Sequence, residues 1–164
     1  MIYFKYLWTV LKHKYYVGKE CFRMGLYWRG LVHDISKLYP SEFFAYAGYF
    51  YKDKNKYCIK FSKAWAHHFT KNKHHWEYWL SSPILEYNKI ETMSDLNTMF
   101  NGASWEIPEM PKVFVKEMVC DWIGAGIVYS GKRDLKEWYD KNKNKIRLNL
   151  KTRELVDRLV QENI

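Results

Sequence analysis

The chain has 164 residues, of which 48% are hydrophobic and 19% aromatic, so it can bury one sizeable core and is not a disordered tail. Its formal net charge of +9 favours an anionic partner, a nucleotide or nucleic acid, although a lysine-rich solvated surface gives the same excess. Three widely spaced cysteines fit neither a disulfide framework nor a zinc knuckle, and no signal peptide or membrane span is apparent. We therefore expect a single cytoplasmic domain over 1–164 and no membrane partner.

Helical spacing predicts three helices in the first third of the chain. The apolar stripe of the first helix repeats every three or four residues and consists of Tyr3, Tyr6, Val10, His13 and Val17. Gly25 indicates a break, and a second helix is expected over 26–38, with Asp34 on its apolar stripe. Pro40 should stop this helix, and Ser41 is the expected N-cap of a third, "SEFFAYAGYFY".

Two further helices are expected on either side of a segment without a clear pattern. A polar loop, "KDKNK", precedes a fourth helix that starts near Cys58 and ends at a turn near Asn72. The turn signals "SSP", "NG" and "PEMP" leave room for a small irregular or β-hairpin insertion within 81–111. A strong helix follows from about Lys112, and Asp121 lies on its apolar stripe.

Two amphipathic segments follow that helix. "RDLKEWYDKNKNK" predicts a surface helix, and "TRELVDRLVQENI" predicts another that Thr152 would cap. The predicted elements make the fold class all-α, a single helical bundle.

Polar residues interrupt the apolar stripes at His13, Asp34 and Asp121. One buried polar residue is usually satisfied by a hydrogen bond, but three such residues beside a histidine cluster indicate a cation held between helices. The cluster is "HHFTKNKHH", which contains His67, His68, His74 and His75. Its alternative is a solvated surface run. Imidazole and carboxylate donors suit Zn, Mn, Fe, Co or Ni, and oxygen-rich positions favour Mn or Mg.

The order of these residues resembles that of HD-domain metal-dependent phosphohydrolases. That order is a histidine, a His-Asp pair (here His33 and Asp34), further histidines and a late aspartate. "HDISKLYP" is similar to a block of the HD-GYP branch, which cleaves cyclic di-GMP, and "EMVCDWIGA" to the helix with the last aspartate. The Gly-Tyr-Pro element itself is absent, and "HHWEYWL" stands in its place. Most of the chain also resembles a small uncharacterised family of bacteria and their phages, with the blocks "HD-SK--P-EF", "AW-HH---NKHHWEYW" and "EM--DW-GA".

The resemblance implies an HD-like bundle that holds one or two divalent ions of unknown identity (Mn, Fe, Co, Ni, Zn or Mg). The first ion would be bound by His13, His33, Asp34 and Asp121. Two or more of His67, His68, His74 and His75 would bind a second. Asp34 would then be catalytic, and the ions would activate water for attack on a nucleotide or a related phosphoester.

Several other residues have two interpretations each. Lys37 would contact a substrate phosphate as a catalytic residue, or would only complement a helix C-terminus. Arg29 would also bind substrate, or would pair with Glu42. Glu77 would orient a histidine, although an exposed helical position is slightly favoured. The aromatic side chains of "WEYW" would stack on a base or, more often for such residues, belong to the core.

Three functions remain open from the sequence. The first is a metal-dependent phosphohydrolase acting on a small phosphorylated substrate. The second is a catalytically silent HD-fold module that binds a nucleotide or cyclic-nucleotide signal. The third is a basic nucleic-acid-binding protein, whose binding would weaken steeply with salt. The substrate, the metal, the oligomeric state and the biological role do not follow from the residues.

Overall fold

The computed structural model of the protein describes residues 1–80 and 107–163, and these ranges contain helices and no β-strand. The α-helices are α1 (Ile2–Arg23), α2 (Tyr27–Val32), α3 (Pro40–Tyr51), α4 (Lys54–Lys71), α7 (Lys112–Ser130), α8 (Leu135–Asn142) and α9 (Leu150–Glu162). Two 3-10 helices, η1 (Ile35–Leu38) and η2 (Trp76–Trp79), complete the described elements. The all-α prediction is confirmed. The insertion expected within 81–111 lies outside the described residues except for 107–111, which form no helix or strand.

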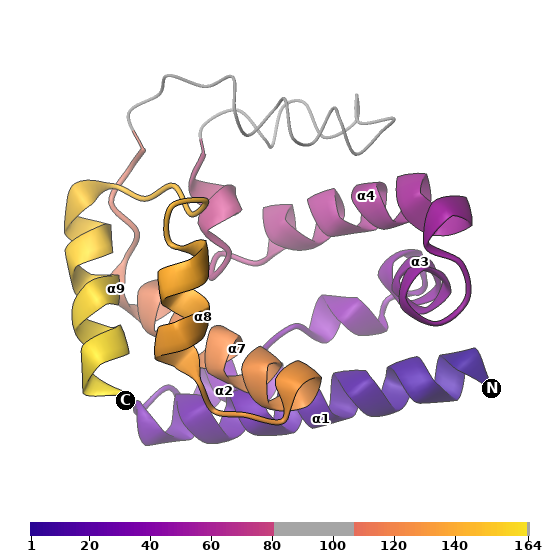
Figure 1. Ribbon diagram of the computed structural model, residues 1–164, viewed down its shortest axis with the longest axis horizontal. Helices are drawn as coiled ribbons and strands as arrows, with labels where there is room; N and C mark the ends of the chain where they lie inside the picture. Colours follow the sequence, from indigo (N-terminus) through magenta and orange to yellow (C-terminus); the bar gives the residue numbers. More distant parts are fainter. Residues whose placement is uncertain (81–106, 164) are drawn as a thin grey trace.

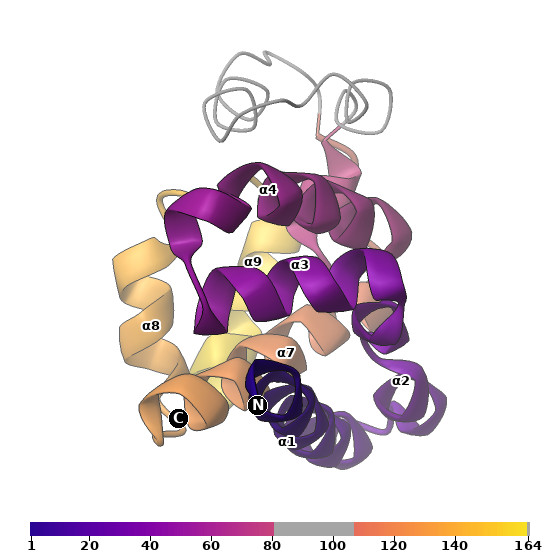
Figure 2. The same cartoon turned by 90° about the vertical axis from the view of Figure 1, so that its right-hand side faces the viewer.

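The helices stack in layers, with α1 along one edge of the molecule (Figures 1 and 2). In both views α3 lies between α1 and α4, and α7 lies against α1. One part of the core joins α7, α8 and α9, and a second part joins α1, α3 and α4. Val17, Cys21 and Cys120 form a small apolar contact where α1 meets α7. The polar stripe residues His13, Asp34 and Asp121 are buried in this interior.

A glycine on α7 sets the distance between α1 and α7. A Cβ atom at Gly124 would lie 2.4 Å from Cγ2 of Val17 and 2.9 Å from its backbone nitrogen. Asp121 lies one turn before Gly124 on α7, and His13 lies one turn before Val17 on α1. Oδ1 of Asp121 is 3.0 Å from Nε2 of His13. The absence of a side chain at Gly124 thus permits the helix contact that brings these two polar residues together.

The expected continuous helix over 26–38 is wrong, and the chain breaks at the His-Asp pair. Helix α2 ends at Val32, His33 has extended backbone angles (φ −51°, ψ 130°), and Asp34 has φ 51° and ψ 29°. Asp34 is the only non-glycine position among 1–80 and 107–163 with a positive φ. Aspartate tolerates this left-handed conformation better than most residues. With this break, both side chains reach one buried centre, where Nε2 of His33 lies 3.4 Å from Oδ2 of Asp34.

Two helix starts differ from their predictions because other residues cap them. Helix α3 begins at Pro40, whose fixed φ suits the first helical position, so Ser41 is not the cap. Helix α4 begins at Lys54 because the side chain of Asp53 accepts a hydrogen bond from the backbone N–H of Lys56, 3.0 Å away. The predicted turn at Asn72 is confirmed, since this residue ends α4.

The last helix also has a different cap from the expected one. Asn149 caps α9 by accepting a hydrogen bond from the backbone N–H of Lys151. Thr152 lies inside the helix instead, where its buried hydroxyl accepts a hydrogen bond from the backbone N–H of Met110. None of the helices in the described ranges combines the length and the apolar character needed to cross a bilayer.

Candidate metal centre

Two groups of buried histidines and carboxylates meet at Asp34. The first group consists of His13, His33, Asp34 and Asp121, and the second of Asp34, His68, His74 and His75. Within each group, one donor atom from every residue lies within 4.8 Å of the others. The side chains come from α1, from the break after α2, from α4, from the segment between α4 and η2, and from α7. Tertiary packing therefore assembles the centre from distant parts of the chain.

The first group has donor separations that suit a bound ion. Nε2 of His13 lies 3.0 Å from Oδ1 of Asp121 and 3.4 Å from Oδ2 of Asp34. Nε2 of His33 lies 3.4 Å from the same oxygen of Asp34 and 3.5 Å from Oδ1 of Asp121. Two donors that each lie about 2.1 Å from one ion are about 3.0 Å apart at right angles and about 3.4 Å apart in a tetrahedron. The observed separations match these values.

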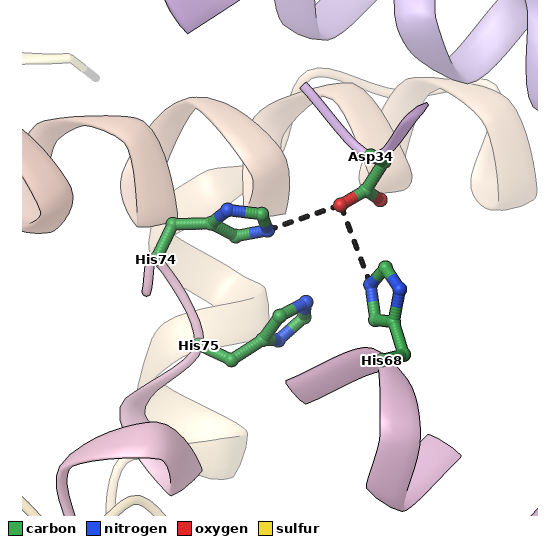
Figure 3. A group of neighbouring side chains, drawn as sticks. All are labelled: Asp34, His68, His74 and His75. Carbon is green, nitrogen blue, oxygen red and sulfur yellow. Dashed lines mark ion pairs between the residues drawn. The ribbon is translucent and has the colours of Figure 1, made fainter. Parts of the chain in front are cut away.

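The second group contacts the other oxygen of Asp34 (Figure 3). Oδ1 of Asp34 lies 3.2 Å from Nε2 of His74 and 3.3 Å from Nε2 of His68. The ring of His75 lies between those two histidines, with its centroid 4.4 Å from that of His74 and 4.8 Å from that of His68. Asp34 thus offers Oδ2 to the first group and Oδ1 to the second, which is how a carboxylate bridges two ions.

Many of the donor atoms lack hydrogen bonds, although buried polar atoms almost always have them. Within the described ranges, no hydrogen bond reaches Oδ1 of Asp34 or the buried Nε2 atoms of His13, His33, His68, His74 and His75, whereas Oδ2 of Asp34 pairs with the ammonium of Lys37. Leaving such groups unsatisfied in the interior costs about 1–3 kcal/mol each. A cation among these atoms would satisfy all of them, so the residues fit a metal site in number, chemistry and spacing.

The charges in the centre stabilise a cation. Burial lowers the pKa of His33, but the negative charges of Asp34, Asp121 and Glu117 outweigh burial and raise it to about 10. Burial raises the pKa of Asp34, yet the positive charges of His33, Lys37 and His68 hold it well below its usual range. A site that favours an imidazolium over a neutral ring in this way also favours a bound metal cation.

Two buried glutamates contact the outward-facing Nδ1 atoms of the histidines. Glu42 lies with Oε2 2.9 Å from Nδ1 of His68 and 3.1 Å from the hydroxyl of Ser36. Its Oε1 lies 2.7 Å from Nδ1 of His67. Glu117 lies with Oε1 3.1 Å from Nδ1 of His33. Carboxylates in such positions fix the ring orientation of metal-binding histidines.

Sequence reasoning missed both glutamates as parts of the centre. Glu117 lies four residues before Asp121, so the two share a face of α7, and this spacing was the available signal. Glu42 entered the prediction only as a partner of Arg29, which is wrong, because Arg29 pairs with Glu117. The guanidinium of Arg29 also lies over the ring of Phe114, 4.6 Å from its centroid.

The structure brings most of the predicted donors together but not His67. Its side chain is 29% exposed, contacts Glu42 and belongs to neither group. Lys37 does join the centre, with Nζ 2.5 Å from Oδ2 of Asp34, although the argument from a shared helix face does not hold.

Glu77 and the aromatic residues beside it can also be placed. The slightly favoured prediction that Glu77 is exposed is wrong, because its side chain is buried. Burial raises the pKa of Glu77 to about 7. One of its oxygens lies 4.0 Å from Nδ1 of His75. Trp76 and Trp79 pack against the core, as predicted by the alternative to base stacking.

A cavity of about 230 Å³ gives access to both groups. Its wall includes His13 and Asp121 from the first group, His75 from the second, and Lys37. Most of the remaining wall is aromatic, formed by Tyr6, Tyr46, Phe50, Phe61, Trp65 and Tyr129. The hydroxyl of Tyr46 is buried and has no hydrogen-bond partner among the described residues. A ligand in the cavity would thus meet candidate metal ligands, an ammonium and aromatic rings.

Comparison with known proteins gives a family but no activity. A search of curated proteins found no match, and a search of solved structures found none either. One family model, described as a family of unknown function (DUF5662), matches residues 3–162. Because this match spans nearly the whole sequence, the chain belongs to the DUF5662 family.

Proposed function

We propose that the protein is a divalent-metal-dependent phosphohydrolase that acts on a nucleotide or a related small phosphoester. The observation that carries the proposal is the position of Asp34, which offers one oxygen to each of two groups of buried donors with ion-like spacing. Paired ions that share a carboxylate are suited to phosphoester hydrolysis. The order of these residues, which resembles that of HD-domain phosphohydrolases, supports the same reaction class.

His13, His33, Asp34 and Asp121 would hold one ion, and Asp34, His68, His74 and His75 the other. When bound, such ions lower the pKa of coordinated water and neutralise charge on phosphoryl oxygens. The protein's own contribution is to fix the donors in a buried centre that borders the described cavity. We propose that the reacting phosphoryl group enters from that side.

Lys37 is the residue that we propose to bind the phosphate. Its ammonium is held by Asp34 at the wall of the cavity, where it can donate to a phosphoryl oxygen. Burial lowers the pKa of Lys37, but Asp34 and Asp121 outweigh burial and raise it, so the side chain stays charged. Arg29, the other predicted substrate contact, is not part of the cavity wall and pairs with Glu117 instead.

The cavity favours a small substrate. Its volume of about 230 Å³ lies below the range of about 300–1,000 Å³ that is common for pockets of drug-sized ligands. The aromatic wall would contact a flat or apolar leaving group. The three cysteines are all free thiols, which agrees with the cytoplasmic location that forms part of the proposal.

The test combines metal content with turnover. Protein purified without a histidine tag is analysed by inductively coupled plasma mass spectrometry, and is then assayed with p-nitrophenyl phosphate, bis(p-nitrophenyl) phosphate and nucleoside mono-, di- and triphosphates. We expect one or two ions per chain and hydrolysis of at least one phosphoester. Asp34→Asn should abolish both, and His67→Ala, a histidine outside both groups, should retain both.

A protein that binds no Mn, Fe, Co, Ni, Zn or Mg would overturn the proposal. So would a metal-loaded protein that hydrolyses none of these phosphoesters. Activity that persists in Asp34→Asn would show that the reaction does not use this centre.

A further inference from the structure

Glu117 contacts a histidine from each of the two donor groups. Its Oε1 atom lies 3.1 Å from Nδ1 of His33, in the first group, and 3.3 Å from Nδ1 of His74, in the second. The two rings lie beside each other, with centroids 4.5 Å apart. The other oxygen of Glu117 accepts a hydrogen bond from Nε of Arg29. Glu117 is 1% exposed, so water does not compete for these contacts.

These contacts determine which nitrogen of each ring faces the centre. Nε2 of His33 and Nε2 of His74 both lie near Asp34, at 3.4 Å and 3.2 Å from its oxygens. An imidazole can bind a cation through Nε2 only when its proton is on Nδ1. A carboxylate that accepts from Nδ1–H favours that tautomer and fixes the plane of the ring. Glu117 makes this contact with His33, and the same oxygen lies 3.3 Å from Nδ1 of His74, which has no hydrogen bond among the described residues, so a small movement of that ring would let one carboxylate oxygen serve both.

A third ion between Glu117, His33 and His74 is the competing explanation, because these three residues also form a group of close donors. Such an ion would use Nδ1 of both rings, whereas their Nε2 atoms face the other two groups. Each ring would then have to lose both of its protons. The guanidinium of Arg29 on the same carboxylate adds a positive charge that disfavours a cation there. The hydrogen-bonding role is therefore favoured.

We infer that Glu117 is a positioning residue shared by the two ion sites, and that its loss weakens the binding of both ions together. The inference rests on the part of the proposed function that assigns one ion to each donor group. It does not depend on the reaction that the ions support.

Glu42 supplies a matched comparison. Like Glu117 it is a buried glutamate that contacts Nδ1 of a histidine, and its Oε2 lies 2.9 Å from Nδ1 of His68. His68 belongs to the second group alone. Replacement of Glu42 by glutamine should therefore weaken the binding of one ion. The same replacement at Glu117 should weaken the binding of two. A glutamine has a single oxygen, so at position 117 it cannot serve both Arg29 and the two histidines.

The experiment measures metal binding by wild type, Glu117→Gln and Glu42→Gln. Metal-free proteins are titrated with Mn²⁺ or Co²⁺ by isothermal calorimetry, and the visible bands of Co²⁺ report nitrogen and oxygen ligation. We expect two ions in the wild type. The loss in affinity should be about 10- to 100-fold for both ions in Glu117→Gln and for one ion in Glu42→Gln. Circular dichroism and thermal unfolding establish that the variants are folded.

A second readout separates positioning from a general structural role. Long-range ¹H–¹⁵N correlation spectra of Zn²⁺-loaded protein, labelled with ¹⁵N-histidine, identify the protonated nitrogen of each ring. In the wild type, His33 and His74 should carry the proton on Nδ1. In Glu117→Gln the signals of these two rings should shift, and those of His67, which contacts Glu42, should not.

The outcomes distinguish this inference from the proposed function. The inference would be overturned if the wild type binds two ions and Glu117→Gln binds only one of them more weakly, or neither. Unchanged His33 and His74 ring signals in Glu117→Gln would also overturn it. Two ions that are both lost in Glu117→Gln, without turnover of any phosphoester, would support the inference and overturn only the proposed reaction. A wild type without ions would overturn both.

Discussion

Lys37 and Asp34 form an ion pair in which Nζ lies 2.5 Å from Oδ2, at the boundary between the candidate metal centre and the cavity. The pair places a positive charge next to the carboxylate that both donor groups share. Lys37 therefore has two distinct effects on its surroundings. We expect it to attract a phosphate in the cavity and to compete electrostatically with any cation bound by Asp34.

Replacement of Lys37 by methionine separates these effects. We expect KM for a hydrolysed phosphoester to rise about 10-fold or more, because a charge-assisted hydrogen bond to phosphate is worth about 1.5–3 kcal/mol. Affinity for the metal should stay equal or increase, since a competing charge is removed. Steady-state kinetics and metal titration provide the two readouts. The exposed Lys60→Met is the control, and weaker metal binding in Lys37→Met would contradict the prediction.

Tyr46→Phe tests the aromatic side of the cavity. The Tyr46 hydroxyl is buried, and no hydrogen-bond partner is available to it in the parts of the chain that the structure describes. An unsatisfied buried group costs about 1–3 kcal/mol, so its removal should leave stability unchanged or raise it. If the hydroxyl contacts the substrate, KM should rise at the same time. A variant with lower stability and unchanged KM would show that the hydroxyl has a structural partner instead.

Metal removal should lower thermal stability by a predictable amount. An ion that binds only the folded state, at a free concentration of 100 times its Kd, stabilises that state by about 2.7 kcal/mol. For a domain of this size, this corresponds to a rise in Tm of about 5–10 °C per ion. Differential scanning calorimetry with and without a chelator measures the change. Asp34→Asn, which keeps a residue that tolerates positive φ, should show no metal-dependent shift.

Gly124→Ala tests whether the α1–α7 contact sets the spacing of the first donor group. The added Cβ would lie 2.4 Å from the Val17 side chain, so the helices must separate. Overpacking of this kind costs about 1–3 kcal/mol. We also expect weaker binding of one ion, because His13 and Asp121 lie one turn away. Gly126→Ala is the control, since its Cβ would meet only the Lys132 carbonyl, at 3.3 Å.

Helical periodicity predicted most of the fold, because the long helices have a regular apolar face. Lys112 was correctly expected to begin a helix, and Asn72 to end one. The cap of α9 was not found, because Asn149 and Thr152 are both good capping residues and only the packing of Met110 against Thr152 distinguishes them.

Most donors of the candidate metal centre could be predicted from the sequence, but the two glutamates that contact its histidines were missed. Histidines and carboxylates in apolar stripes mark buried positions, and this pattern identified His13, Asp34 and Asp121. Spacing alone did not separate His67 from His68, because adjacent helical residues differ only in the direction they face. The break at Asp34 left no local signal either, since neither glycine nor proline marks it and the segment 26–38 has a continuous helical pattern.

The two donor groups differ in how much of the chain they need. The second group lies entirely within residues 34–75, whereas the first requires His13 and Asp121, which are far apart in sequence. During synthesis, a chain that has not yet reached α7 can assemble at most the second group. An unfinished or truncated product would therefore lack the first ion, and a reaction that needs both ions would begin only once α1 and α7 had packed together. The proposed hydrolysis, if it uses both groups, would thus depend on a completed fold.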